Sequence, residues 1–534
     1  MSKYFKKFDT HEQYEQYTQE DMILPNVSYC EDNDEMYYNP IHDYSQDYLT
    51  FVALEDGTIS FNIHKLMGIE YITSISYSTD NGETWTTTAN QNNKSEHLVI
   101  DVDVNTGDKI LWKGTATQTG YFDDYDYFDW VGSFFSSDCE FDAKGNVMSL
   151  LYGDNFKDHT TIEKNGAFSS LFYDYNLYDY DNRKLCGIVN AKDMSLPATT
   201  LTENCYNSMF CGCTSLTTAP SILPAITLAD NCYQCMFSLC SSLTTAPKLP
   251  ATILAIECYR LMFSICTSLT TAPTLPATTL TYACYQDMFQ GCSSLINAPE
   301  LPATTLVPHC YNSMFYNCTS LTTAPILHAT TLDEYCYDYM FYNCTSLTTA
   351  PELPATTLAN YCYQCMFQNC TSLVTAPTLP ATTLVSACYG GMFSGCTALM
   401  IIPELPATTL AASCYAGMFN GCTSLTTAQS ILPATALTIR CYENMFKNCT
   451  SLTTAPELPA TTLIMGCYYD MFNGCTNLNY IKAMFTTTPG SDYTRNWLNN
   501  VAAIGTFIRN IAATWLTTEE YGVPNGWTIQ TATA

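Results

Sequence analysis

The stretch CYQDMFQGCSSLINAPELPATTL, residues 284–306, decides the fold because it returns with small changes through the second half of the chain. Its leading cysteine has ten counterparts, and eight of the ten spacings between them are 26 residues. The other two spacings are 27 residues, and each contains an extra isoleucine, Ile222 or Ile431. Such a period is the signature of a solenoid, in which each unit buries its apolar side only against its neighbours.

The residues of one unit predict a helix followed by a short strand. Apolar side chains recur every four positions from Leu280 to Cys292, which is typical of one face of a helix. Thr278 or Thr279 is suited to cap this helix, and the segment 294–299 predicts a strand that pairs in parallel with the same segment of the next unit. The side chains expected in the core are Cys284, Tyr285, Met288, Phe289, Cys292 and Leu295.

The position of Gly291 is expected to end the helix in a left-handed conformation. Most units have glycine or asparagine there, and both residues tolerate a positive φ. Leu239 and Ile265 break this rule, so we expect their turns to differ from the others or to be strained.

The pattern CYxxMFxxCxSL followed by LPATTL resembles the BspA-type leucine-rich repeats. Met288-Phe289, Cys292, Leu295 and Pro302 match that pattern, whereas Cys284-Tyr285 stands where the family usually has Ile-Gly. The resemblance covers residues 197–484. It implies an α/β leucine-rich-repeat solenoid of eleven units that serves as a scaffold for adhesion or binding.

The flanks of the solenoid predict a chain of several domains. Alternating apolar and polar residues around Asp-Gly, Asn-Gly and Thr-Gly turns predict a small β-sandwich with Phe61, Trp85 and Trp112 in its core. The predicted segments are an extended anchoring segment at 1–47, the sandwich at 48–118, a β-rich connector at 119–164, a capping repeat at 165–196, the solenoid at 197–484 and a C-terminal cap at 485–534. In that last cap, Trp497, Val501, Ile504, Phe507 and Ile511 are expected to cover the last coil.

The 28 cysteines are interpreted as a ladder of buried, reduced thiols, with disulfides or zinc as the alternatives. Two acidic clusters, one starting at Asp123 and the other at Asp174, are either solvated loops or a calcium site. Histidines are scattered, and neither a nucleophile–base pair nor a phosphate-binding loop is found. The sequence therefore predicts no enzyme, no cofactor and no metal among the assigned site residues.

Composition excludes several classes of partner. Fifty acidic against 20 basic residues give a net charge of −30, which opposes binding to nucleic acid and to anionic lipid. No stretch approaches the roughly 20 apolar residues of a membrane helix. The first residues, MSKYFKKFDTHEQYEQ, lack the apolar region of a secretory signal peptide, so we expect none.

The segments FDTHEQYEQYTQ (8–19) and PNVSYCEDNDEMYYNP (25–40) resemble the N-terminal segment of virion proteins of crAss-like and related tailed phages. Stretches within residues 48–156 are similar to proteins of these phages and their hosts. The resemblance implies a virion protein whose N-terminus binds the capsid or another virion protein. The anchor residues are then Tyr4, Phe5, Phe8, Tyr14, Tyr17, Pro25, Asn26, Tyr29, Tyr37 and Tyr38.

The first functional hypothesis is a phage head fibre, capsid decoration or tail fibre, assembled in the host cytoplasm and carried on the virion as a homodimer or homotrimer. Its solenoid would bind glycans or proteins of the host surface or mucosa. Tyr316, Tyr339 and Tyr342 stand at variable repeat positions and are either ligand-facing or plain surface residues. The alternative is a BspA-like bacterial surface adhesin.

Overall fold

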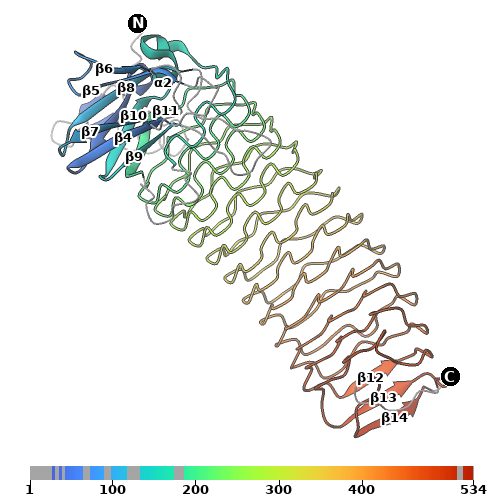
Figure 1. Ribbon diagram of the computed structural model, residues 1–534. Coiled ribbons are helices and arrows are strands. Elements are labelled where there is room, and N and C mark those ends of the chain that lie inside the picture. Colours follow the sequence, from blue (N-terminus) through green and yellow to red (C-terminus); the bar gives the residue numbers. More distant parts are fainter. Residues whose placement is uncertain are drawn as a thin grey trace.

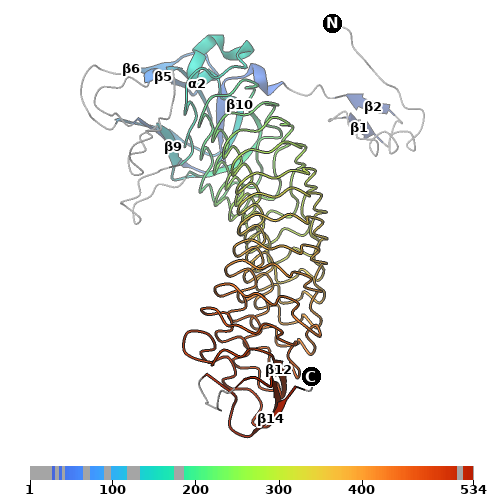
Figure 2. The ribbon, with the colours of Figure 1, turned by 90° about the vertical axis from the view of Figure 1, so that its right-hand side faces the viewer.

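The computed structural model describes residues 27–30, 35–38, 43–63, 72–89, 98–116, 133–173, 186–513 and 521–532. Two sheets lie at one end of the molecule, and the repeats extend from them as a long stack of coils (Figure 1). Turned by 90°, the stack is seen to be bowed (Figure 2). Among the described residues, none of the helices has the length and apolarity that a bilayer crossing requires.

The N-terminal part is built from a six-stranded and a three-stranded sheet. The strand orders are β11-β10-β3-β8-β5-β6 and β7-β4-β9, and all pairings are antiparallel except the parallel pair β10–β11. The strands are β3 (Leu49–Ala53), β4 (Gly57–Ile63), β5 (Ile72–Ser78), β6 (Thr86–Ala89), β7 (Leu98–Val104), β8 (Lys109–Ala116), β9 (Phe134–Ser137), β10 (Phe141–Asn146) and β11 (Ile188–Ser195).

Aromatic rings from both sheets form the core between them. Phe51, Phe61, Trp112 and Phe135 are fully buried, and their ring centroids lie 4.6–6.1 Å apart. The prediction that Trp85 belongs to this core is wrong. Its ring is half-buried at the surface, where the Lys113 ammonium lies 4.0 Å from its centroid, because Trp85 precedes the edge strand β6.

Short elements complete this part. An antiparallel pair, β1 (Val27–Cys30) with β2 (Glu35–Tyr38), is formed within the predicted anchoring segment. Three short helices follow further on, η1 (Tyr44–Gln46), α2 (Ser149–Tyr152) and η2 (Gly153–Asp158).

The sandwich passes into the repeats without a break in hydrogen bonding. Asn190 of β11 bridges in parallel to Thr218, which begins the ladder of the repeats. Residues 165–173, within the predicted capping repeat, lie against the first full repeat, and their amides bond to its carbonyls, as in Phe168 N to Cys205 O at 2.7 Å. Both sheets also include strands from outside the predicted range 48–118, namely β9, β10 and β11.

The helix predicted in every repeat is not formed anywhere in residues 186–513, all of which the structure describes. The segment is instead a ribbon of tight turns. In the unit of Cys284, the amides of Met288 and Gln290 bond three residues back, to Tyr285 O and Asp287 O at 3.2 and 3.1 Å. The amides of the alternate residues bond forward to carbonyls of the next coil, as in Phe289 N to Met314 O at 3.0 Å. The α half of the predicted α/β class is therefore wrong.

Each ribbon requires a left-handed residue at every fourth position, so that the chain can turn repeatedly. In the Cys284 unit these are Ala283, Asp287 and Gly291, with φ of 50°, 55° and 72°. Leu239 and Ile265 adopt the same geometry as Gly291, with φ of 64° and 60°. Their turns therefore do not differ in shape, and they carry the strain of a β-carbon in the left-handed region.

The predicted strand is reduced to a single paired residue per coil. Thr245, Thr271, Asn297 and Thr323 are joined by successive parallel bridges, each to the same position of the next unit. The prolines that follow this position in the chain have no amide hydrogen to donate to a ladder, which prevents longer strands. Pairing is parallel and in the predicted register, but no extended strand forms within residues 197–479.

The core of the stack consists of rows of identical side chains. Phe289 stacks on Phe263 and Phe315 at 5.6 and 5.7 Å, and this row continues from Phe172 to Phe472. A second row runs from Tyr206 to Tyr468 at 5.7–6.1 Å. All six side chains expected in the core are buried, namely Cys284, Tyr285, Met288, Phe289, Cys292 and Leu295.

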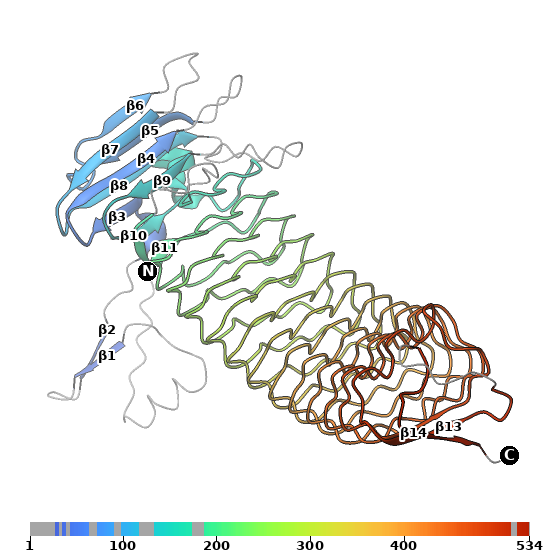
Figure 3. The same cartoon turned by 60° about the horizontal axis from the view of Figure 1, so that its bottom comes forward.

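The C-terminal region continues the stack for two further, irregular coils. Strands β12 (Tyr480–Ala483), β13 (Gly505–Arg509) and β14 (Trp527–Thr531) pair in parallel at the end opposite the sandwich (Figure 3). Trp497 and Phe507 are buried there. Ile504 and Ile511 are 75% and 77% exposed, so the prediction that they cover the last coil is wrong.

Candidate binding surface

The turn ribbons place pairs of side chains alternately inside and outside the stack. In the Cys284 unit, Cys284-Tyr285 and Met288-Phe289 are buried, whereas Gln286-Asp287 and Gln290-Gly291 are partly exposed. Stacking repeats this alternation along the coils, although some outward positions, such as Asn207, Asn312 and Asp338, are also buried. We call the surface formed by the outward pairs, together with the two residues before each leading cysteine, the turn face.

An aromatic row crosses the turn face over three coils. His309 stacks on Tyr335 at 4.8 Å, and Tyr335 stacks on Tyr361 at 4.7 Å, with ring planes within 6° of parallel. Tyr282 meets His309 edge-on at 5.5 Å. The three stacked residues have φ of 56–59°, a conformation that is unfavourable for a bulky residue such as tyrosine. The sequence signal was an aromatic residue directly before the leading cysteine in three consecutive units.

The three tyrosines predicted from the sequence come together beside this row. Tyr316 and Tyr342 stack at 4.5 Å with planes 4° apart, and Tyr339 lies tilted at 6.4 and 5.7 Å from them. All three are partly exposed. Because Tyr316 and Tyr342 each cover one ring face of the other, this cluster presents ring edges, hydroxyl groups and at most one face of each of these two rings to solvent.

Two carboxyl groups are partly enclosed in the turn face. Burial raises the pKa of Asp338 to about 7, opposed by the hydrogen bond that Asn312 Nδ2 donates at 3.3 Å. Burial likewise raises the pKa of Asp287 to about 6, opposed by the charge of Arg260. Burial, the neighbouring Tyr361 and the negative charges of Glu334 and Asp338 raise the pKa of the Tyr335 hydroxyl, and Glu334 directly precedes Tyr335 in the chain.

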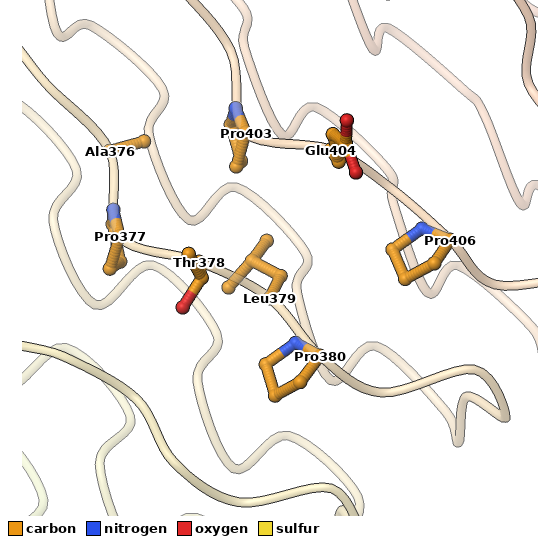
Figure 4. A pocket seen from close by; sticks show the side chains of 8 residues that line it. All are labelled: Ala376, Pro377, Thr378, Leu379, Pro380, Pro403, Glu404 and Pro406. Carbon is orange, nitrogen blue, oxygen red and sulfur yellow. The ribbon is translucent and has the colours of Figure 1, made fainter.

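A different side of the stack carries a shallow hollow of about 290 Å³ between two coils. Two pairs of prolines border it, Pro377 with Pro380 and Pro403 with Pro406, with Glu404 at one side (Figure 4). Since proline has no amide hydrogen, the two coils are not bonded here. Apart from Glu404 and Thr378 the lining is apolar or backbone, so the hollow lacks the convergent polar groups of a ligand site.

The thiols are enclosed and protonated. From Cys139 onward, none of the cysteines is joined in a disulfide, and all but Cys235 are buried. Burial raises the pKa of Cys284 to about 11 and that of Cys292 to about 12. Cys292 Sγ donates to Phe263 O of the previous coil at 3.1 Å, and the same bond recurs along the stack.

Within the described ranges, no three His, Cys, Asp or Glu side chains are grouped to hold a metal ion. The acidic clusters at Asp123–Asp129 and Asp174–Asp181 lie outside the described residues. So do most of the predicted anchor residues: Tyr4, Phe5, Phe8, Tyr14, Tyr17, Pro25 and Asn26. Tyr29, Tyr37 and Tyr38 lie on β1 and β2.

Comparison with known proteins concerns the repeats. A crystal structure of a leucine-rich repeat protein from Bacteroides ovatus is similar over 68% of this chain and 98% of that chain, at 17% identity and a TM-score of 0.26. No curated protein matches the chain. The model of the BspA type leucine rich repeat region matches residues 227–374, 275–400 and 391–493, which together are half of the chain. This chain therefore belongs to the BspA-type leucine-rich-repeat family.

Proposed function

We propose that this chain is a non-enzymatic surface adhesin whose repeats form a solenoid that holds a binding face rigid. The observation that supports this most is the contrast within each coil. The Phe and Tyr rows and the buried thiols are the same in every unit, whereas the turn face gathers tyrosines and carboxylates at the surface. A continuous core of this kind leaves the outward side chains free for recognition.

The proposed partner is a glycan or protein of a host surface. The acidic chain, with a net charge of −30, favours partners with basic surfaces over nucleic acid. Many copies on one surface would make individually weak contacts effective. Association of the chain into a dimer or trimer would add to this effect.

The second candidate is a virion protein anchored by residues 1–47. It is supported by the resemblance of residues 5–40 and 48–156 to phage proteins, and the family model above matches the repeats and not these segments. In that case the same repeats would project from the particle.

Attachment and localisation test these two candidates together. Beads coated with the full chain are expected to bind mucin-coated surfaces or epithelial cells above albumin-coated beads. An antibody against residues 197–484 is expected to label the surface of the producing bacteria. Label confined to phage particles would replace the adhesin by the virion protein, and beads that attach no better than albumin would overturn both binding roles.

A further inference from the structure

The eleven repeats differ from each other mainly on the turn face. The five positions of Cys284, Tyr285, Met288, Phe289 and Cys292 hold the same residue in every unit. Burial explains that constancy. It does not explain the Thr-Thr pair of the LPATTL segment, which is exposed, as at Thr304 and Thr305, and yet recurs in seven of the eleven units. Exposure alone therefore does not let a position vary.

The position of Tyr335 shows the opposite behaviour. Across the eleven units it holds Asn, Glu, Ala, His, Tyr, Ser, Arg and Gly, always with a positive φ. Glycine or asparagine would satisfy this backbone with the least strain. The two tyrosines in consecutive units, Tyr335 and Tyr361, are therefore held against local preference. Strain of this kind at an exposed surface is a pointer to function rather than to stability.

The geometry of the rings narrows the class of ligand. Sugars stack on the open faces of aromatic rings, but the faces of Tyr335 are covered on both sides by His309 and Tyr361 at 4.7–4.8 Å. Tyr316 and Tyr342 each cover one ring face of the other, so each has at most one open face. What the cluster offers is a set of ring edges and hydroxyl groups at fixed spacing. Rigid tyrosines presented in this way are the main contact residues of protein-binding paratopes.

The charges near the rings specify the partner further. Glu334 is exposed beside Tyr335, and its carboxylate is oriented by a hydrogen bond from Asn360 Nδ2 at 2.9 Å. Asp333 is partly exposed and lies on the same coil. A lysine or arginine brought next to these carboxylates would be attracted to them, and the acidic chain as a whole would steer such a partner toward it.

We infer that the part of the turn face formed by Tyr282, His309, Tyr316, Tyr335, Tyr339, Tyr342 and Tyr361 is the docking surface for a protein segment that carries basic side chains. This inference rests on the proposed function as a binding scaffold. It assigns recognition to the turn ribbons, rather than to the bridged threonine row or to the proline-lined hollow.

The test compares two triple variants of the full chain. The first replaces His309, Tyr335 and Tyr361 by serine, which the stack already accommodates at the equivalent Ser413 with φ of 54°. The control replaces the exposed Thr304, Thr330 and Thr356 by alanine in the same coils. The probes are a displayed library of random 12-residue peptides and a glycan array.

Selected peptides are expected to be rich in Lys and Arg, to lose at least about ten-fold in affinity for the first variant, and to keep theirs for the control. The single variant Glu334→Gln, at an exposed position, is expected to weaken the same peptides several-fold and to reduce the dependence of binding on salt. Peptides that bind the first variant as well as the wild type would overturn the inference.

Two other results would also overturn it. One is a chain that selects no peptides. The other is glycan binding that the serine variant alone abolishes, which would assign this surface to carbohydrate. Peptide binding that behaves as expected, together with beads that fail to attach to cells, would instead overturn the adhesive role and leave the docking surface in place.

Discussion

Replacing Asp338 by asparagine should stabilise the protein, and more so as the pH rises. Burial raises the pKa of this carboxyl from the ordinary 3.8 to about 7. An acid with a raised pKa keeps its proton in the folded state after the unfolded chain has lost it. Stability is therefore fully retained below about pH 4 and is lost as the pH rises toward 7. Asparagine stays neutral throughout and can still accept the hydrogen bond from Asn312.

The size of the effect follows from these two pKa values. Each pH unit between them lowers the stability of the wild type by about 1.4 kcal/mol, and the loss ends near pH 7. The advantage of Asp338→Asn is thus roughly 1–2 kcal/mol at pH 5 and roughly 4 kcal/mol at pH 8. The difference between the two conditions, roughly 2–3 kcal/mol, does not depend on how well the amide packs.

Hydrogen exchange followed by mass spectrometry measures this locally, in peptides that span residues 330–345, after correction for intrinsic exchange at each pH. Asp80→Asn is a control of opposite sign. Hydrogen bonds from Thr84 lower the pKa of Asp80 to about 2, so this variant should destabilise its own loop at neutral pH. An Asp338→Asn variant whose protection relative to wild type is the same at pH 5 and pH 8 would refute the reasoning.

Three further predictions concern the stack itself. Leu239→Gly should raise the free energy of unfolding by about 0.5–1 kcal/mol, because glycine removes the strain at φ of 64°; a lower urea midpoint would contradict it. Cys292→Ala should lower it by about 1–2 kcal/mol because the donor to Phe263 O is lost, whereas Cys292→Ser keeps a donor; equal losses in the two variants would show that the bond contributes nothing. A thiol reagent should titrate few of the 28 cysteines in the native chain, Cys235 among them, and all 28 in denaturant; rapid native reaction of most would mean that the coils open.

The sequence predicted the stack and its core but misassigned the local structure, for a reason visible in the spacing. A helix turns by about 100° per residue, so side chains four apart drift by about 40° at each step. From Leu280 to Cys292 the drift would reach about 120°, and the stripe would leave the core. The pattern of two buried and two outward residues shows no such drift, and it matches a turn that repeats every four residues.

The candidate site was only partly predictable. Tyr316, Tyr339 and Tyr342 could be selected because they stand at variable positions of the repeat. The sequence did not predict the row formed by His309, Tyr335 and Tyr361. A helix brings together side chains three or four residues apart within one unit, and it gives no reason to expect contact between the residues that precede the leading cysteines of neighbouring units. Their contact depends on the distance between coils, which comes from the bonds between ribbons and is not encoded at any single residue.

The bonds that run forward from each ribbon to the next also govern how such a gene can change in length. Every coil offers its successor the same donors and acceptors, so whole units of 26 residues can be duplicated or deleted and the cut ends still fit. Between the leading cysteines, a single extra residue occurs only at Ile222 and at Ile431. Both lie in the proline-containing segment of the unit, where their side chains are exposed and the coils meet at isolated bridges. Recombination between units can therefore lengthen, shorten or reorder the displayed aromatic cluster while the spine beneath it stays intact.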